Sequence, residues 1–284
     1  MKKYTTLIAL IALLVCLMSL TACEELFIQT GGTAEDTTAE STPEETTTEA
    51  APETTLPQTT EPETSAPPEL PKKRVALTFD DGPSRQGLTV RIVDEFKKYG
   101  GKATFFMLGN LISSTTGEAL AYAQQNGFEI GIHGYTHDVY FDTCTEEEFL
   151  SELALTREAI EQYTNTEVTL LRPPGGRITR ERAIQSGYPI IFWSVDTEDW
   201  LYQRRPNEET IRQHVDTIVE NAIKNIEDGD IVLLHEIYMN SFEATCLILE
   251  RLHEMGFEFV TVSELLGEES LTAGSYIYSK TDIK

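Results

Sequence analysis

From Pro71 to the C-terminus, short apolar segments alternate with longer ones in which apolar residues recur every three or four positions. The short segments are rich in β-branched and aromatic residues, which is typical of buried strands, and the longer ones are typical of amphipathic helices. The predicted strands are 74–79, 103–108, 129–132, 169–171, 189–195, 230–234 and 257–262. The predicted helices are 86–99, 117–126, 145–163, 179–186, 207–226, 242–254 and 263–266. Thr145, followed by Glu148 three residues on, is a capping-box pattern that marks one helix start.

This alternation predicts an α/β fold in which parallel strands are joined by right-handed crossover connections. About seven such units in roughly 195 residues favour a barrel, with an open doubly wound sheet as the alternative. The sequence contains no phosphate-binding loop and no GxGxxG pattern, so nothing indicates a nucleotide-binding fold. In a barrel and in an open sheet alike, the functional residues lie at the carboxyl ends of the strands.

The N-terminus predicts export. Lys2-Lys3 precedes an apolar segment, 7–20, which ends in Leu20-Thr21-Ala22-Cys23. Small residues before a cysteine resemble the lipobox of bacterial lipoproteins, so we expect residues 1–22 to be a lipoprotein signal peptide. Cys23 would then carry lipid and attach the protein to the extracellular face of the cell membrane. The alternative is a plain secretory signal cleaved near Ala22, and that too places the protein outside the cytoplasm.

Residues 24–70 contain no Lys or Arg and consist largely of Thr, Glu, Pro, Ala and Ser. Such a composition cannot bury enough apolar area to offset its chain entropy, so residues 23–70 are predicted to be a disordered tether. Residues 71–284 would be the catalytic domain. The net charge of −25 leaves no basic stripe for nucleic acid, which excludes a general nucleic-acid binder. Cys144 and Cys246 remain in the predicted folded part, and the sequence leaves open whether they pair.

Polar residues follow several of the predicted strands. Asp80 and Asp81 follow the first strand, and His133 and His137 follow the third. Two imidazoles four residues apart can reach one ion if the loop or turn there is helical, and either carboxylate would complete a set of two histidines and one carboxylate. Such a set leaves coordination positions open for water and substrate, as a catalytic zinc site requires.

The remaining carboxylate would be free to act as a general base beside the ion. Arg172, which follows the fourth strand, is placed to pair with that carboxylate, and Gly175-Gly176 offer N–H groups for an oxyanion. His235 ends the sixth strand, and Asp199 is its natural partner, which would make His235 a proton donor.

Trp193 and Trp200 are candidates for lining a sugar-sized groove, and packed core or rim positions are the alternative for each.

At this point the chain resembles a known family through motifs that occur in a fixed order. TFDDGP at 78–83, HGYTH at 133–137, RPPGG at 172–176, DTEDW at 196–200 and LLH at 233–235 resemble the five motifs of the NodB-type polysaccharide deacetylases, carbohydrate esterase family four. The resemblance extends from about Lys73 to the end and includes AGSYIY at 273–278. It implies a distorted (β/α)7 TIM-like barrel, the NodB homology domain.

The resemblance also implies roles for residues at the matching positions. Asp81, His133 and His137 would hold a divalent metal, often Zn²⁺, with Co²⁺ and Mn²⁺ as alternatives. Asp80 would be the base steered by Arg172, and His235 the acid tuned by Asp199. Gly175, Trp200 and Leu233 would face the substrate or the oxyanion.

The implied reaction is hydrolysis of an N-acetyl or O-acetyl group on a glycan of the cell wall or an exopolysaccharide. Peptidoglycan N-acetylglucosamine is our expected substrate. Acetylated xylan, exopolysaccharide and chitin-type polymers are alternatives, as is a catalytically silent glycan-binding barrel.

Three residues depart from the family's pattern. Gly134 stands where Ser or Thr is usual, Gly175 replaces an often aromatic residue, and Glu236 stands where Asp commonly follows the histidine. None of these changes removes a catalytic group, so the sequence predicts an active enzyme.

Overall fold

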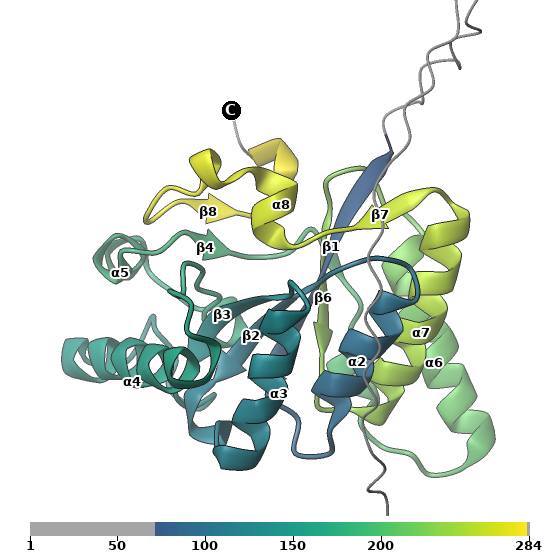
Figure 1. The fold of residues 1–284 in the computed structure, drawn as a ribbon, viewed down its shortest axis with the longest axis horizontal. Coiled ribbons are helices and arrows are strands. Elements are labelled where there is room, and N and C mark those ends of the chain that lie inside the picture. The colour runs from purple at the N-terminus through teal and green to yellow at the C-terminus, as the bar shows by residue number, and fades with distance from the viewer. Residues whose placement is uncertain (1–71, 283–284) are drawn as a thin grey trace, which may run out of the picture. The chain divides into compact units, whose positions relative to one another are not determined.

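The computed structural model describes residues 72–282 (Figure 1). The predicted signal peptide, the lipidation site at Cys23 and the tether lie outside these residues and remain predictions. Within 72–282, no helix combines the length and apolar character needed to cross a bilayer.

The fold is built on a parallel sheet with β1 at its centre. Its strands run in the order β3-β2-β1-β6-β5, and β7 pairs with the first residues of β1. Val75 to Asp80 of β1 are all buried, as expected for a strand with neighbours on both sides and helices outside. The strand bounds are β1 Lys73–Gly82, β2 Thr104–Leu108, β3 Glu129–Gly134, β5 Val195–Asp196, β6 Ile231–His235 and β7 Phe257–Phe259.

One segment closes the sheet into a distorted barrel, which confirms the predicted fold class. Leu171 forms single bridges to Ile132 of β3 and to Ile190 of β4, Ile190–Ile191. The chain then continues from β4 into β5, which pairs with β6 at the other edge of the sheet. The segment from Leu171 to Asp196 therefore joins the two sheet edges.

Two strand predictions on this closing segment were wrong in detail. The predicted strand 169–171 is reduced to the Leu171 bridges, and beyond Arg172 the ladder cannot continue, because Pro173 and Pro174 offer no N–H. The predicted strand 189–195 is split. The Phe192 N–H donates to the Ile277 carbonyl of β8, Tyr276–Ile277, whereas the Ser194 N–H donates to the Ile231 carbonyl of β6. The chain thus changes partners, and β8 was not predicted as a strand.

All the predicted helices are present, and the capping box at Thr145 and Glu148 is confirmed. The helices surround the sheet, with α2, α3, α6 and α7 standing beside it in Figure 1. The helix bounds are α2 Leu88–Lys97, α3 Ser114–Gln125, α4 Glu146–Thr164, α5 Arg180–Ser186, α6 Glu208–Ile223, α7 Met239–Glu254 and α8 Val262–Leu266.

The apolar side chains form two cores. The larger one lies between the strands and the outer helices and includes Phe79 and Phe96, whose rings meet edge to face. The smaller one takes alternate residues of the strands, such as Ala76, Phe106 and Ile231, and these side chains fill the barrel interior. Because the interior is packed, a site can form only at an end of the barrel.

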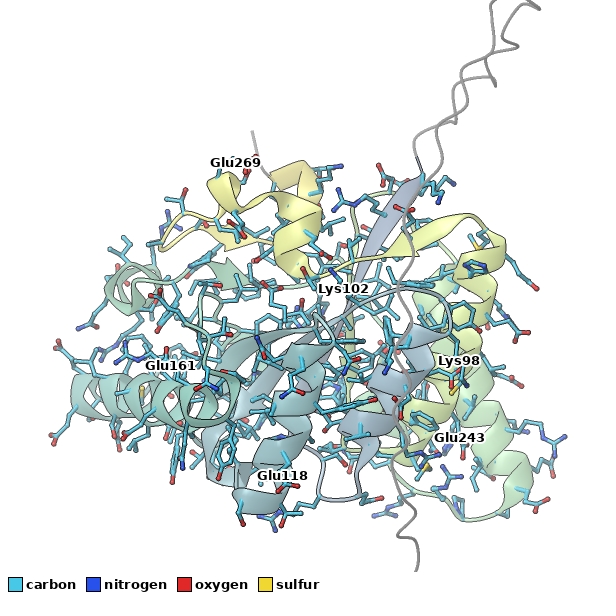
Figure 2. The ribbon with its side chains drawn as sticks, in the orientation of Figure 1. Lys98, Lys102, Glu118, Glu161, Glu243 and Glu269 are labelled. Atoms are coloured by element: carbon cyan, nitrogen blue, oxygen red, sulfur yellow. The ribbon has the colours of Figure 1, made fainter. Side chains whose placement is uncertain are left out.

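Acidic side chains lie on the outer helices, and Figure 2 labels Glu118 on α3, Glu161 on α4 and Glu243 on α7. Cys144 and Cys246 are both free thiols, which answers the question of pairing that the sequence left open.

Candidate active site

The two aspartates at the carboxyl end of β1 point into one site because the strand changes conformation there. Adjacent residues of a regular strand face opposite sides of the sheet. Asp81, however, has φ 69°, and the pairing of β1 with β2 shifts register between Phe79 and Gly82. A positive φ is uncommon for a residue with a side chain and is typical of functional positions. As a result, carboxylate oxygens of Asp80 and Asp81 lie 3.9 and 3.5 Å from the same atom, His133 Nε2.

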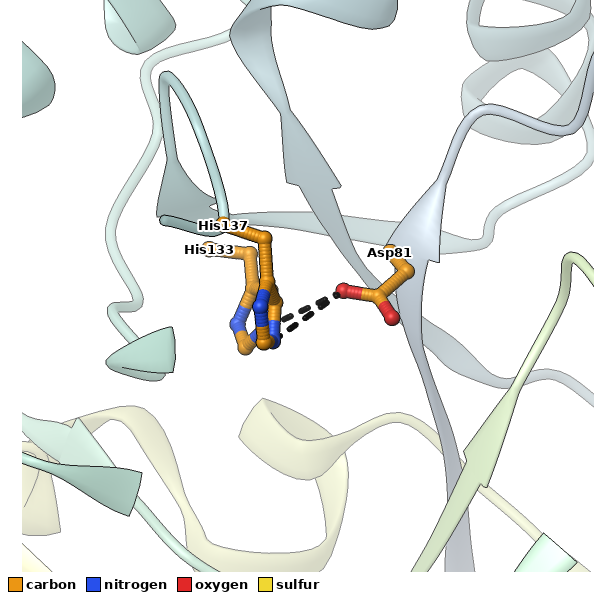
Figure 3. Close-up of side chains that lie close together, drawn as sticks. All are labelled: Asp81, His133 and His137. Carbon is orange, nitrogen blue, oxygen red and sulfur yellow. Dashed lines mark ion pairs between the residues drawn. The ribbon is translucent and has the colours of Figure 1, made fainter. Parts of the chain in front are cut away.

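Asp81, His133 and His137 form a candidate metal site (Figure 3). Asp81 Oδ1 lies 3.5 Å from His133 Nε2 and 3.7 Å from His137 Nε2. In Figure 3 the two imidazoles lie together and face the carboxylate. Asp81 Oδ1 is buried and has no hydrogen-bond partner among the described residues. A buried carboxylate oxygen aimed at two imidazole nitrogens fits a divalent cation.

The state of His133 supports this fit. Its Nδ1 lies 2.8 Å from the Arg172 carbonyl oxygen, which can only accept, so Nδ1 carries the proton and Nε2 is left with its lone pair. Burial lowers the pKa of His133 and outweighs the opposing attraction of Asp80 and Asp81. The ring is therefore neutral at physiological pH, as a metal ligand must be.

Asp80 is held by a fully buried arginine. Arg172 Nη1 donates to Asp80 Oδ1 at 2.9 Å and to Thr78 Oγ1 at 2.7 Å. Arg172 Nε donates to the Ile191 carbonyl at 3.0 Å, and Nη2 donates to the Phe192 carbonyl at 2.8 Å. Burial lowers the pKa of Arg172, and the Asp80 carboxylate partly offsets this effect. An arginine with these partners fixes the Asp80 carboxylate in one orientation.

A second pair of charged groups lies opposite Asp80, because His235 is the residue of β6 in register with it. His235 Nδ1 lies 2.8 Å from Asp199 Oδ1, and the His235 backbone N–H donates to Asp199 Oδ2, also at 2.8 Å. Burial is the largest single effect and lowers the pKa of His235, but Asp199 more than compensates, and the pKa rises to about 9. His235 is therefore protonated at neutral pH and can donate a proton.

Gly175 lies beside this site in the 3₁₀ turn Pro174–Gly176, with φ 58°. Within the turn, the N–H groups of Gly176 and Arg177 donate to the carbonyls of Pro173 and Pro174, and the N–H of Gly175 takes no part in these two bonds. A Cβ at Gly175 would lie 3.4 Å from the Tyr140 ring. Tyr140 thus lies next to position 175, where the family often has an aromatic residue and this chain has glycine.

The other predicted substrate-side residues lie in different environments. Trp200 is 45% exposed in the 3₁₀ helix Asp199–Tyr202, directly after the partner of His235. Leu233 is buried in β6, two residues before His235 and on the same face of the strand. Trp193 is partly buried and packs against the core, 5.6 Å from the Arg172 guanidinium, which favours the packed-core alternative for this residue.

Glu236, the third departure from the family's pattern, is buried behind the aspartates. One oxygen of its carboxyl group accepts a hydrogen bond from Thr89 Oγ1, and the other occupies the space that a Cβ of Gly82 would need. Burial raises the pKa of Glu236 to about 8, so it is protonated at neutral pH. Position 82 must therefore be glycine while Glu236 lies there.

Sequence reasoning missed three residues that hold the predicted ones. Thr78 Oγ1 accepts from Arg172, and Ser241 Oγ donates to Asp199. Glu152 of α4 accepts hydrogen bonds from backbone N–H groups between His133 and His137. Only Glu152 had a usable signal, because it is a carboxylate on the apolar face of a predicted helix.

Comparison with known proteins agrees with this geometry. Residues 68–190 match the sequence description of the family "Polysaccharide deacetylase". The chain is 35% identical over 219 residues to peptidoglycan-N-acetylglucosamine deacetylase PgdA of Listeria monocytogenes, covering 76% of this chain and 44% of that protein. It is 34% identical over 203 residues to a peptidoglycan-N-acetylglucosamine deacetylase of Bacillus cereus, covering 69% of this chain and 89% of that protein.

Among solved structures, peptidoglycan deacetylase PdaC of Bacillus subtilis is 35% identical, with a TM-score of 0.62 over 70% of this chain and 91% of that one. The chain thus spans less than half of the Listeria relative but nearly all of the B. subtilis structure and of the B. cereus protein.

The geometry predicts that one divalent ion binds per chain and that both histidines are needed for it. His133→Ala and His137→Ala should each lower metal content well below one equivalent, because each removes one of three ligand atoms. Metal content after dialysis, measured by mass spectrometry of the purified proteins, checks this. Stoichiometric metal in either variant would contradict the ligand set.

Proposed function

The chain belongs to the polysaccharide deacetylase family, and we propose that it is a metal-dependent hydrolase that removes N-acetyl groups from peptidoglycan N-acetylglucosamine. One observation carries this proposal: a candidate metal site lies between an aspartate fixed by a buried arginine and a histidine protonated at neutral pH. Hydrolysis of an amide needs a base for the attacking water and an acid for the leaving amine, and these two groups suit those tasks.

Asp81, His133 and His137 would hold the ion, with Zn²⁺ as the first choice and Co²⁺ or Mn²⁺ as alternatives. When bound, such an ion supplies Lewis-acid polarisation of the acetyl carbonyl and of water.

The protein's own groups would carry the proton transfers. Asp80, held by Arg172, accepts the proton of the attacking water, and His235, held by Asp199, donates a proton to the leaving nitrogen. The Gly175 N–H would face the oxygen on which negative charge develops.

The choice of an amide over an ester as the substrate follows from the candidate general acid, His235. An amine leaves poorly unless it is protonated, whereas an alkoxide leaving from an ester needs that help less. A histidine that is paired with a buried aspartate and can donate a proton therefore favours an N-acetyl substrate over an O-acetyl one.

The choice of peptidoglycan follows from the predicted anchor at Cys23. A flexible tether of about 47 residues has a root-mean-square reach of roughly 40 Å, which would keep the domain close to the membrane and within reach of the wall. The two peptidoglycan deacetylases from L. monocytogenes and B. cereus support the same choice.

Acetate release tests the function. The purified protein with Zn²⁺, Co²⁺ or Mn²⁺ should release acetate from peptidoglycan and less from chito-oligosaccharides or acetylated xylan. Muropeptides from cells that lack the protein should contain less deacetylated glucosamine. If the muropeptides are unchanged while an exopolysaccharide or xylan is altered, the proposed substrate is wrong and the proposed deacetylation reaction stands. No acetate from any polymer would favour a silent glycan-binding barrel.

Loss of the base should slow turnover without loss of metal. Asp80→Asn keeps the shape of the side chain but cannot accept the proton, so we expect kcat to fall by about 10²- to 10⁴-fold. Metal content measured on the same sample serves as the control. Activity within a few-fold of wild type would show that Asp80 is not the base.

The pKa of His235 predicts a decline of activity in alkaline solution. The acid must be protonated, so kcat/KM should fall as pH rises through about 9, and a bound cation would move this limb to lower pH. Asp199→Asn removes the compensating charge, so the limb should move further toward neutral pH. A pH–rate profile whose alkaline limb is the same in both proteins would rule out this pairing as the source of acid catalysis.

The predicted anchor is tested by Cys23→Ala. Without the lipid-bearing thiol, the protein should appear in the culture medium instead of the membrane fraction. Fractionation and immunoblotting measure this. A variant that still sediments with the membrane would indicate an uncleaved apolar segment.

A further inference from the structure

We propose that Glu152 is a positioning residue that holds the loop between His133 and His137 in the conformation that brings both imidazoles to one ion. The proposal rests on the metal site of the proposed function but not on the substrate or on turnover.

The location of Glu152 is unusual for a carboxylate. It lies on α4 on the same face as Phe149, Leu153 and Ile160, which pack into the core, and it is 8% exposed. Among the ion pairs of residues 72–282, none involves Glu152. A buried carboxylate without a cation is costly unless hydrogen bonds stabilise it.

Those hydrogen bonds come from the loop that follows β3. Glu152 Oε2 accepts from the backbone N–H of Tyr135 at 2.6 Å and from that of Thr136 at 2.7 Å. The Thr136 hydroxyl lies 3.4 Å from the other carboxylate oxygen. Two short bonds from consecutive N–H groups to one oxygen are charge-assisted and fix the direction of the backbone.

The residues held in this way lie between the two histidines. The Tyr135 carbonyl accepts from the Asn110 N–H at 3.0 Å, so Tyr135 is fixed on both sides of its backbone. His137 lies in the turn that follows, and its side chain is 40% exposed. Its ring contacts are with His133 and Tyr140, at 5.5 and 6.3 Å between centroids, and His133 lies at the other end of the held backbone, so the course of that backbone contributes to the placement of His137.

Gly134 suits the backbone of this loop. Its φ is 138°, which side chains rarely adopt, and a Cβ there would lie 3.2 Å from the Thr136 carbonyl oxygen and 3.3 Å from Pro174 Cγ. Glu152 Oε2 would be in ordinary contact with that Cβ, at 3.4 Å, so it is the backbone of the loop that favours glycine at this position.

The test compares Glu152→Ala and Glu152→Gln with Glu148→Ala. Glu148 is a matched control, because it is a carboxylate one turn earlier on α4 that caps the helix through Thr145. Zn²⁺ and Co²⁺ affinities of the full chain are measured by chelator competition. Hydrogen exchange of residues 134–137 is measured in the metal-free protein.

Glu152→Ala should bind either metal at least ~10-fold more weakly than wild type, a loss in the range known for outer-shell partners of metal ligands. Its loop amides should also exchange faster. Glu152→Gln keeps an acceptor oxygen, so its loss of metal affinity should be smaller. This variant also tests the proposal if Glu152→Ala does not fold. Glu148→Ala should lower thermal stability but leave metal affinity and loop exchange unchanged.

Metal affinity of Glu152→Ala and Glu152→Gln within two-fold of wild type would overturn the proposal. Equal losses in the Glu148 and Glu152 variants would also overturn it, because they would reflect general stability. A wild-type protein that binds neither ion would overturn this role together with the metal site. If wild-type protein binds metal, the Glu152 variants bind it weakly and no glycan is deacetylated, the proposed function fails while the positioning role stands.

Discussion

The buried ion pair between Arg172 and Asp80 is the interaction on which the rest of the site depends. Removing a guanidinium from water is costly, and this one is stabilised by a carboxylate, a hydroxyl and two carbonyls. These partners come from β1 and from β4 with the residue after it, while the Arg172 carbonyl accepts from His133 of β3. A single residue therefore orients the candidate base, fixes the tautomer of a candidate metal ligand and joins the strands where the barrel closes. The apolar interior below supports it, with the Phe106 ring 4.3 Å from the guanidinium.

The candidate base and the candidate acid share one design, in which the charged group is held by a more deeply buried partner. Arg172 holds Asp80, and Asp199 holds His235 while Ser241 and a backbone N–H hold Asp199. Glu152 does the same for the histidine loop through backbone N–H groups. Such supporting groups place catalytic atoms before the substrate arrives, so little reorganisation is needed during the reaction.

Much of this arrangement could be predicted from the sequence, because hydrophobic periodicity defines strands and helices and parallel strands bring their carboxyl ends together. That rule places Arg172 beside one of the two aspartates and His235 near Asp199, the family resemblance names Asp80 as the partner of Arg172, and both pairs are present. The split of 189–195 could not be predicted, because it depends on which neighbours offer carbonyl oxygens on either side of Trp193. Thr78 and Ser241 gave no signal, since a hydroxyl in a strand or helix is ordinary until its tertiary partner is known.

The positive φ of Asp81 sets stability against function at a single position. A left-handed backbone conformation costs a residue with a side chain about 1 kcal/mol relative to glycine, and Asp81 also carries a negative charge beside Asp80. The chain retains an unfavourable residue there, and its Oδ1 has no hydrogen-bond partner among residues 72–282. A lineage that no longer needed the ion would gain folding free energy by replacing this aspartate with glycine. Loss of the metal site in such a lineage would therefore begin in β1, the central strand of the barrel. The first substitution toward a catalytically inactive relative would make the protein more stable.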